Sequence, residues 1–152
     1  MLSDMGLSCV RFFIIYSERG LDVMESLINQ ALAQKVWAVV GATQNKDKFG
    51  YKVYKTLKEH GYQAYPVNPF YDEIDGDKCY DNLSSLPEVP GVVSIIISPD
   101  RSEPFIREAA QIGCKFVWFQ PGAERNDLVK LAQSLELKVI SNACAIIEVG
   151  KG

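Results

Sequence analysis

The chain has 152 residues, of which 47% are hydrophobic and 23% charged, so its size and composition predict one soluble globular domain with a sizeable core. Its formal net charge of −3 gives no sign of the basic surface with which proteins bind nucleic acids. A single histidine and four cysteines without a CxxC pair argue against a zinc site and favour a reducing, cytoplasmic location.

The first segment, residues 1–23, is expected to be an N-terminal appendage outside the core. Its apolar run CVRFFIIY (9–16) is too short to span a bilayer and is interrupted by Arg11. No basic segment precedes the run and no small-residue cleavage site follows it, so we expect neither a secretory signal nor a membrane partner. From Met24 the stretch MESLINQALAQ is typical of a short amphipathic helix, and the domain is therefore expected to span residues 24–152.

From residue 35 onward, apolar runs typical of buried strands alternate with segments of helical periodicity. The expected strands are 35–40, 63–68, 92–98, 115–120 and 137–142. Helices are expected at about 50–60, 101–112 and 124–135. Gly61 is well placed as a left-handed cap of the first helix, and Gly113 ends the second. The polar segment 69–90 has room for a short strand near 78–80 and a helical turn at 83–86.

This alternation predicts an α/β fold: a Rossmann-like, doubly wound parallel sheet with helices on both faces, in a single domain. In such sheets a ligand binds at the carboxyl ends of the strands, where the chain reverses direction across the sheet. We expect the reversal between the first strand and the strand at 92–98. Pro66, in the second strand, is acceptable only if its missing N–H faces away from a partner strand.

The loop after the first strand, GATQNKDKFG, has the character of a phosphate-binding loop. Gly41 permits a ligand to approach the backbone closely, and a helix beginning near Gly50 offers free N–H groups and the positive end of its dipole. Thr43 adds a hydroxyl donor. Lys46 and Lys48 can pair with further phosphate charge. Together these residues suit a diphosphate.

Two familiar nucleotide signatures are absent. The dinucleotide fingerprint GxGxxG is missing, because eight residues separate Gly41 from Gly50, and there is no GxxxxGK[ST]. At the end of the second strand, where an acidic residue would hold a ribose diol, this chain has Asn68 and Pro69. Because a carboxylate there would repel a phosphorylated ribose, its absence favours a nucleotide with an extra phosphate over NAD.

The stretch VVGATQNKDKFGYKVYKTLKEHGYQAYPVNP resembles the signature of the small stand-alone CoA-binding domain proteins. The later stretches SIIISPD, VWFQPGAE and VISNACAIIE match the strand ends of that family, so the resemblance covers about residues 27–148. The fold is also similar to the CoA-binding part of the succinyl-CoA synthetase alpha subunit. The resemblance implies coenzyme A as the ligand.

The resemblance also implies a role for particular residues. The pyrophosphate and ribose phosphate would be surrounded by Gly41, Ala42, Thr43, Lys48, Phe49 and Gly50. The nucleotide would be flanked by Asn68 and Pro69, pantetheine would run along Ser98 and Pro99, and the crevice would be lined by Gln120, Pro121 and Gly122. Many relatives carry an Asp-Arg-Cys-like stretch where this chain has Ser141-Asn142-Ala143-Cys144, so no arginine stands beside the cysteine.

The sequence shows no set of catalytic residues. His60 stands at a helix end before Gly61, where it suits capping. Cys144 lies near the carboxyl edge of the sheet, but no histidine can activate it and no second cysteine is near in sequence, so a disulfide with CoA is the less favoured interpretation.

We therefore expect a small cytoplasmic protein that binds CoA or acyl-CoA without intrinsic catalysis. The alternatives are an NAD(P)-linked oxidoreductase or sensor domain, or a subunit of an acyl-CoA ligase. An oxidoreductase should carry a substrate domain and a ligase a grasp domain, and neither fits in 152 residues. The expected partner is a small molecule, not nucleic acid, and the sequence indicates no particular protein partner.

Overall fold

The computed structural model describes residues 23–151 of the chain. Nearly all of the expected appendage, residues 1–23, therefore lies outside the described residues, and its separation from the core stays a prediction. The described part opens with a helix at 23–32. Among residues 23–151, no helix is long and apolar enough to cross a membrane.

Five strands form the main sheet, with helices between them. The strands are β1 (Val36–Val40), β2 (Gln63–Val67), β5 (Val92–Ile95), β6 (Phe116–Phe119) and β7 (Lys138–Ile140). The helices are α2 (Phe49–Glu59), α3 (Glu103–Ile112), α4 (Asn126–Ser134) and α5 (Ala145–Lys151), with a 3₁₀ turn η1 (Pro99–Arg101) ahead of α3. Two short strands, β3 (Glu73–Ile74) and β4 (Asp77–Lys78), form a separate hairpin.

The main sheet is parallel throughout and runs in the order β2-β1-β5-β6-β7. After β2 the chain crosses back over β1 to β5, which confirms both the Rossmann-like fold and the expected reversal between these two strands. Pro66 lies in the edge strand β2, where its carbonyl accepts a hydrogen bond from the N–H of Tyr80. Because N and O of one residue face the same side of a strand, the proline nitrogen points away from β1.

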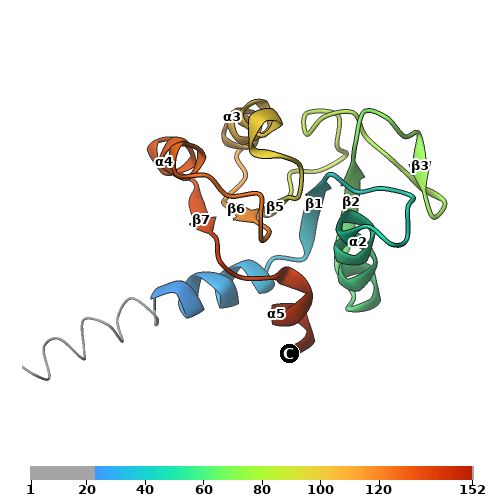
Figure 1. Cartoon of the computed structure of the whole chain (residues 1–152), viewed down its shortest axis with the longest axis horizontal. Helices are drawn as coiled ribbons and strands as arrows, with labels where there is room; N and C mark the ends of the chain where they lie inside the picture. Colours follow the sequence, from blue (N-terminus) through green and yellow to red (C-terminus); the bar gives the residue numbers. More distant parts are fainter. Residues whose placement is uncertain (1–22, 152) are drawn as a thin grey trace, which may run out of the picture.

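Two helical layers cover the sheet (Figure 1). The helix at 23–32, α2 and α5 pack on one face, and α3 and α4 pack on the other. In the first layer the rings of Trp37 and Trp118 lie 5.6 Å apart. Their ring N–H groups donate to the carbonyl oxygens of Gln34 (2.9 Å) and Ala143 (2.8 Å). Each buried tryptophan is thus satisfied, so both strands can carry a large side chain in the core.

The structure departs from the sequence expectations mainly at element ends. The strand expected at 92–98 stops at Ile95. The N–H of Ile96 still donates to the carbonyl of Val40 in β1, and the chain then turns into η1. Helix α5 was not expected, since its seven residues carry too little helical periodicity to identify it. The turn expected at 83–86 is a single hydrogen-bonded turn. The short strand expected near 78–80 lies slightly earlier, as β4, and is followed by an isolated bridge from Tyr80 to Val67.

The hairpin between β3 and β4 had a signal in the sequence that was missed. Its two-residue turn is Asp75-Gly76, and both residues have positive φ, 50° and 83°. Asp-Gly favours this turn type because both positions need the left-handed region. The expected helix-ending glycines are confirmed, with φ of 86° at Gly61 and 88° at Gly113.

Gln120 ties the sheet to α5 from the end of β6. The residue is only 1% exposed. Its side-chain N–H donates to Ser94 Oγ (3.0 Å), and its side-chain oxygen accepts from the backbone N–H of Ala145 (3.0 Å). One buried amide therefore satisfies a serine of β5 and the first N–H of α5, and it fixes where α5 begins.

Replacing Gln120 by leucine should destabilise the fold. The substitution keeps the size of the side chain but leaves the buried N–H of Ala145 without an acceptor, which costs about 1–3 kcal/mol. Urea unfolding should show this loss for Gln120→Leu and almost none for Gln133→Leu, a matched change at an exposed position of α4. Equal stability of the two variants would show that the buried amide contributes nothing.

Candidate functional site

A pocket of about 630 Å³ lies at the carboxyl ends of β1, β2 and β5. Four stretches of the chain form its wall: the end of β1 with its loop, the first turn of α2, the end of β2 with the segment after it, and the segment that joins β5 to α3 together with the first turn of α3. The lining residues are Val40, Gly41, Thr43, Lys48, Phe49, Gly50, Val67, Asn68, Pro69, Phe70, Tyr71, Ile96, Ile97, Ser98, Arg101 and Phe105. The pocket thus occupies the place where the chain reverses across the sheet, which is the usual ligand position in this architecture.

Two glycines bring the end of β1 against the start of α2. Gly41 has a φ of 103°, and a Cβ there would lie 3.0 Å from Cγ2 of Ile97. A Cβ on Gly50 would overlap the carbonyl oxygen of Gly41. Both positions therefore need glycine, one for its backbone conformation and the other for direct backbone contact. This contact places the first turn of α2 at the edge of the pocket.

The N-terminus of α2 faces this pocket with unused donors. The helix begins after Lys48, whose side chain makes no capping hydrogen bond, and its first turn carries no acidic residue. The backbone N–H groups of Phe49, Gly50 and Tyr51 have no acceptor within residues 23–151. Three free donors and the positive end of the helix dipole make this turn a favourable place for an anionic group.

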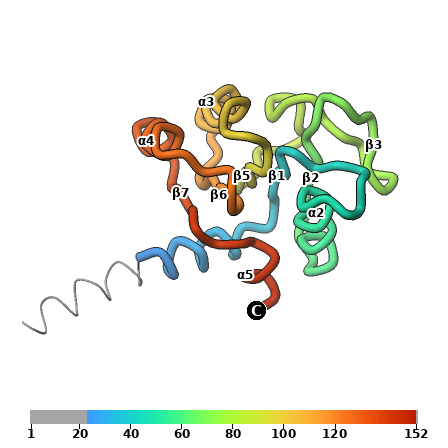
Figure 2. The backbone as a smooth tube through the Cα atoms, in the orientation of Figure 1, coloured from blue at the N-terminus to red at the C-terminus, as the bar shows by residue number. Residues whose placement is uncertain are grey.

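The loop from 41 to 48 is braced by the segment that follows β2 (Figure 2). Asn68 donates from its side chain to the carbonyl of Ala42 (2.8 Å) and accepts from the N–H of Phe70 (2.9 Å). The hydroxyls of Thr43 and Tyr71 are hydrogen bonded at 3.0 Å. The amide of Asn68 is thus committed to loop structure at both ends, so its side chain holds the pocket in shape.

The β3–β4 hairpin is fastened to α2 by tyrosine–aspartate hydrogen bonds. Tyr51 donates to Asp75 (2.6 Å), while Tyr54 and Lys58 both donate to Asp77. Burial alone would raise the pKa of Asp77, but the hydrogen bonds from Lys58 and Tyr54 lower it below the ordinary value. Because the folded-state pKa is depressed, this cluster stabilises the fold above the ordinary aspartate pKa, and its contribution is lost as the pH falls through the folded value.

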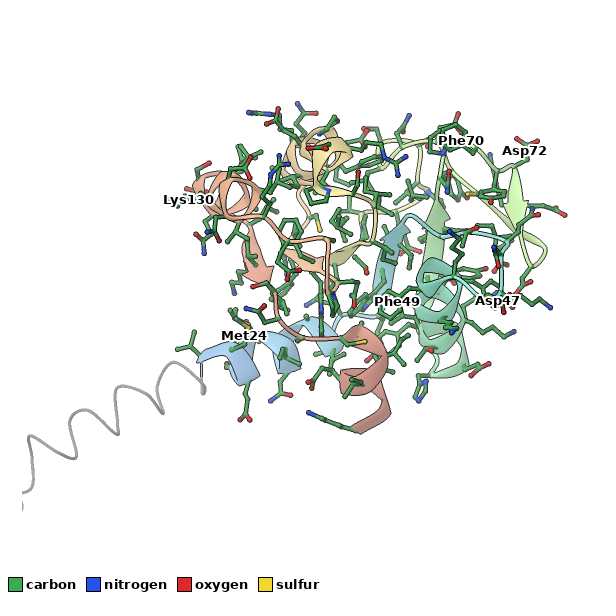
Figure 3. All side chains as sticks on the ribbon, in the orientation of Figure 1. Met24, Asp47, Phe49, Phe70, Asp72 and Lys130 are labelled. Carbon is green, nitrogen blue, oxygen red and sulfur yellow. The ribbon has the colours of Figure 1, made fainter. Side chains whose placement is uncertain are left out.

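The charge of the pocket wall is positive. Of the residues that the structure describes, those lining the pocket include two cations, Lys48 and Arg101, and no aspartate or glutamate. Neither side chain forms an ion pair or hydrogen bond with any other residue of 23–151. Much of the remaining wall is apolar, including Phe49, Phe105 and Phe70, which is 78% exposed. Figure 3 labels Phe49 beside the first turn of α2 and Phe70 at the outer end of β2.

The structure brings together about half of the residues nominated from the sequence. On the pocket wall are Gly41, Thr43, Lys48, Phe49, Gly50, Asn68, Pro69 and Ser98. Not on the wall are Ala42, Lys46, Pro99, Gln120, Pro121 and Gly122. Ala42 is buried beneath the loop, Lys46 is exposed outside the pocket, and the last three follow β6, beyond the strands that line the pocket. A ligand-binding role for these residues stays a prediction.

Most of the apolar residues that line the pocket, and the cation Arg101, were not predicted from the sequence. The missed residues are Val40, Val67, Phe70, Tyr71, Ile96, Ile97, Arg101 and Phe105. A signal existed for some of them. The largely apolar run VVSIII (92–97) extends two residues beyond the end of β5, and these two residues, Ile96 and Ile97, line the pocket. Arg101 stands close behind a strand end, where parallel sheets place their ligand-contacting residues.

None of the three cysteines in the described residues 23–151 lines the pocket. Cys79 and Cys114 are buried, and burial raises the pKa of Cys114 to about 11. Cys144 is half-buried beside the start of α5 and is not a lining residue. Among residues 23–151, no cluster of three histidine, cysteine, aspartate or glutamate side chains could hold a metal ion.

Comparison with known proteins gives the family. The family model for the CoA binding domain matches residues 35–150, so the chain belongs to the CoA-binding domain family, and the resemblance seen in the sequence is confirmed. The solved structure of a hypothetical protein from Pyrococcus horikoshii OT3 superposes with a TM-score of 0.80 and 32% identity, covering 84% of this chain and 90% of the other.

Two further relatives are matched over very different shares of their own length. The uncharacterized protein YneT of Bacillus subtilis is 30% identical over 110 residues, which cover 70% of this chain and 79% of YneT. The alpha subunit of the ADP-forming acetate–CoA ligase II of Pyrococcus furiosus is 32% identical over 118 residues, covering 70% of this chain and 26% of the subunit. The chain spans about a quarter or less of the acetate–CoA ligase chains that it matches.

Gly50→Ala should destabilise the protein without any ligand present. The new methyl group meets a backbone carbonyl that cannot rotate away, so α2 must shift, at a cost of about 1–3 kcal/mol. The matched control is Gly150→Ala in α5, where the added Cβ meets nothing within 4 Å and no loss is expected. Urea unfolding of both variants measures the difference. Equal stabilities would show that β1 and α2 are not in direct backbone contact.

Proposed function

We propose that this member of the CoA-binding domain family binds coenzyme A or an acyl-CoA in the pocket at the ends of β1, β2 and β5, and holds it without turning it over. One observation carries the proposal: the open N-terminus of α2 lies in a pocket where, among the described residues, two cations are unpaired and no acidic residue lines the wall. Such a wall favours a ligand with several negative charges.

The diphosphate of CoA fits the first turn of α2. Gly41 and Gly50 leave the backbone bare at this point, so phosphate oxygens can approach the three free N–H groups. Lys48 precedes that turn and supplies a positive charge at the same place. Backbone donors, helix dipole and one ammonium group together suit two linked phosphates.

The apolar wall suits the rest of the molecule. Phe105 and Ile97 offer a flat, dry surface for the adenine ring, and the exposed Phe70 offers a second aromatic face at the pocket edge. Phe49 and Ser98 lie on the same wall and suit the mixed apolar and amide character of pantetheine.

The site favours CoA over NAD. NAD-binding proteins of this fold hold the ribose diol with a carboxylate at the end of the second strand. Here Asn68 follows the second strand, and its side-chain amide is already hydrogen bonded to the carbonyl of Ala42 and the N–H of Phe70. The pocket wall carries a second cation, Arg101, besides Lys48. This second charge suits the additional phosphate that CoA carries and NAD lacks.

Binding without turnover is supported by the chemistry of the wall. It holds no histidine, cysteine or carboxylate among the described residues, and these are the usual general acids, bases and nucleophiles. The free cysteines of the described residues suit a reducing compartment, which supports a cytoplasmic location.

A second candidate is the CoA-binding part of an acyl-CoA ligase, because the relatives include an acetate–CoA ligase alpha subunit. In that case the chain would act together with other ligase domains. The match to most of YneT favours a module that works by itself.

Titration with CoA tests the proposal. A ligand that binds only the native state stabilises it by about 2.7 kcal/mol at a hundredfold excess over its dissociation constant. At roughly 2–4 °C per kcal/mol for a domain of this size, Tm should rise by several degrees with CoA or acetyl-CoA. NAD should leave Tm nearly unchanged, and acetyl-CoA should be recovered intact afterwards.

The matched variants are Lys48→Gln and Lys52→Gln. Both remove one charge, but Lys52 is an exposed residue of α2 outside the pocket. Calorimetry should show CoA affinity falling about tenfold or more in Lys48→Gln, as expected when a charge-assisted hydrogen bond is lost. Affinity in Lys52→Gln should stay close to that of the parent chain. Equal affinity for CoA and NAD, or hydrolysis of acetyl-CoA by repurified protein, would contradict the proposal.

A further inference from the structure

Arg101 lies on the wall of the pocket that is formed by the segment between β5 and α3. It is the last residue of η1, and its backbone N–H donates to the carbonyl of Ser98 (3.0 Å). Arg101 is a lining residue of the pocket and is exposed. Lys48 approaches the pocket from another segment, the loop ahead of α2. The two cations therefore come from different parts of the chain and suit two different anionic groups.

The surroundings of Arg101 leave its guanidinium group unpaired. Its two acidic neighbours in sequence are both engaged by other arginines. Asp100 accepts from Arg125 (2.7 Å), and Arg125 also binds Asp127 (2.6 Å). Glu103 pairs with Arg107 at 3.6 Å, one turn along α3. No hydrogen bond or ion pair joins the Arg101 side chain to any residue of 23–151.

The covalent structure of CoA indicates that Arg101 can bind the 3′-phosphate. Its ribose carries adenine and the 3′-phosphate on the same ring, so the two groups must bind close together. Arg101 ends η1 and Phe105 lies in the first turn of α3, only four residues later, and both line the pocket. Adenine against Phe105 and Ile97 would bring the 3′-phosphate to Arg101, while the diphosphate extends toward the first turn of α2.

Arginine is also the suitable side chain for this group. A phosphomonoester carries up to two negative charges and presents several oxygens. The planar guanidinium group can donate two parallel N–H bonds to such oxygens, which a lysine cannot do.

We propose that Arg101 determines the specificity of the pocket by binding the 3′-phosphate of CoA, which leaves Lys48 and the α2 N-terminus to the diphosphate. This inference rests on the proposed function. It identifies the preferred ligands as those that carry 3′-phosphoadenosine, and it predicts that the chain discriminates CoA from dephospho-CoA through one side chain.

Four calorimetric titrations test the inference: the parent chain and Arg101→Gln, each with CoA and with dephospho-CoA. The parent chain should bind CoA at least tenfold more tightly than dephospho-CoA. In Arg101→Gln the affinity for CoA should fall about tenfold or more, and the affinity for dephospho-CoA should change less than twofold. The control is Lys130→Gln, the same charge change on the exposed surface of α4 (Figure 3), which should alter neither affinity.

The outcomes separate this inference from the proposed function. If the parent chain does not bind CoA, the function itself fails. If it binds CoA and Arg101→Gln loses both ligands equally, Arg101 contacts the diphosphate and the inference is overturned while the function stands. If Arg101→Gln binds both ligands like the parent chain, Arg101 contacts neither phosphate and the inference is overturned as well.

Discussion

The direct contact between the backbones of Gly41 and Gly50 is the constraint on which the rest of the site depends. A side chain at Gly50 would overlap the carbonyl of Gly41, so α2 can begin here only because Gly50 lacks one. The contact fixes the first turn of α2 beside the end of β1, and the free N–H groups of that turn therefore face the pocket. The loop between the two glycines is then held from outside by Asn68 and Tyr71. The donors are thus oriented before any ligand arrives, which lowers the entropy lost on binding.

Local sequence signals predicted the fold correctly and also named the residues from the loop after β1 and the first turn of α2 that line the pocket. A strand, a glycine-containing loop and a helix follow one another from Val36 to Glu59. Glycine positions and helical periodicity can both be recognised within such a short stretch of sequence. The far wall of the pocket could not be found in this way. Phe70, Arg101 and Phe105 come from segments whose approach is set by the order of the strands. Arg101 in addition needs its acidic neighbours to be paired elsewhere, and a sequence does not show that.

Two amides show why residue type alone does not assign a role. Gln120 and Asn68 both follow a strand at the ligand edge, and both were nominated as contacts. In the structure Gln120 is buried between Ser94 and the start of α5, and Asn68 holds Ala42. The side chains that remain available to a ligand are those without an internal partner. Lys48 and Arg101 therefore give the pocket its charge, and paired acids such as Asp100 do not reduce it.

The most direct test of the account is an amide chemical-shift titration of the ¹⁵N-labelled chain with CoA. Binding of CoA at the first turn of α2 should cause saturable changes that are largest at Phe49, Gly50 and Tyr51, with further changes at Gly41 and Arg101. Amides far from the pocket, such as Gly113 and Gly150, should stay nearly unmoved. Largest changes around β7 and α5, with the first turn of α2 unaffected, would contradict the account.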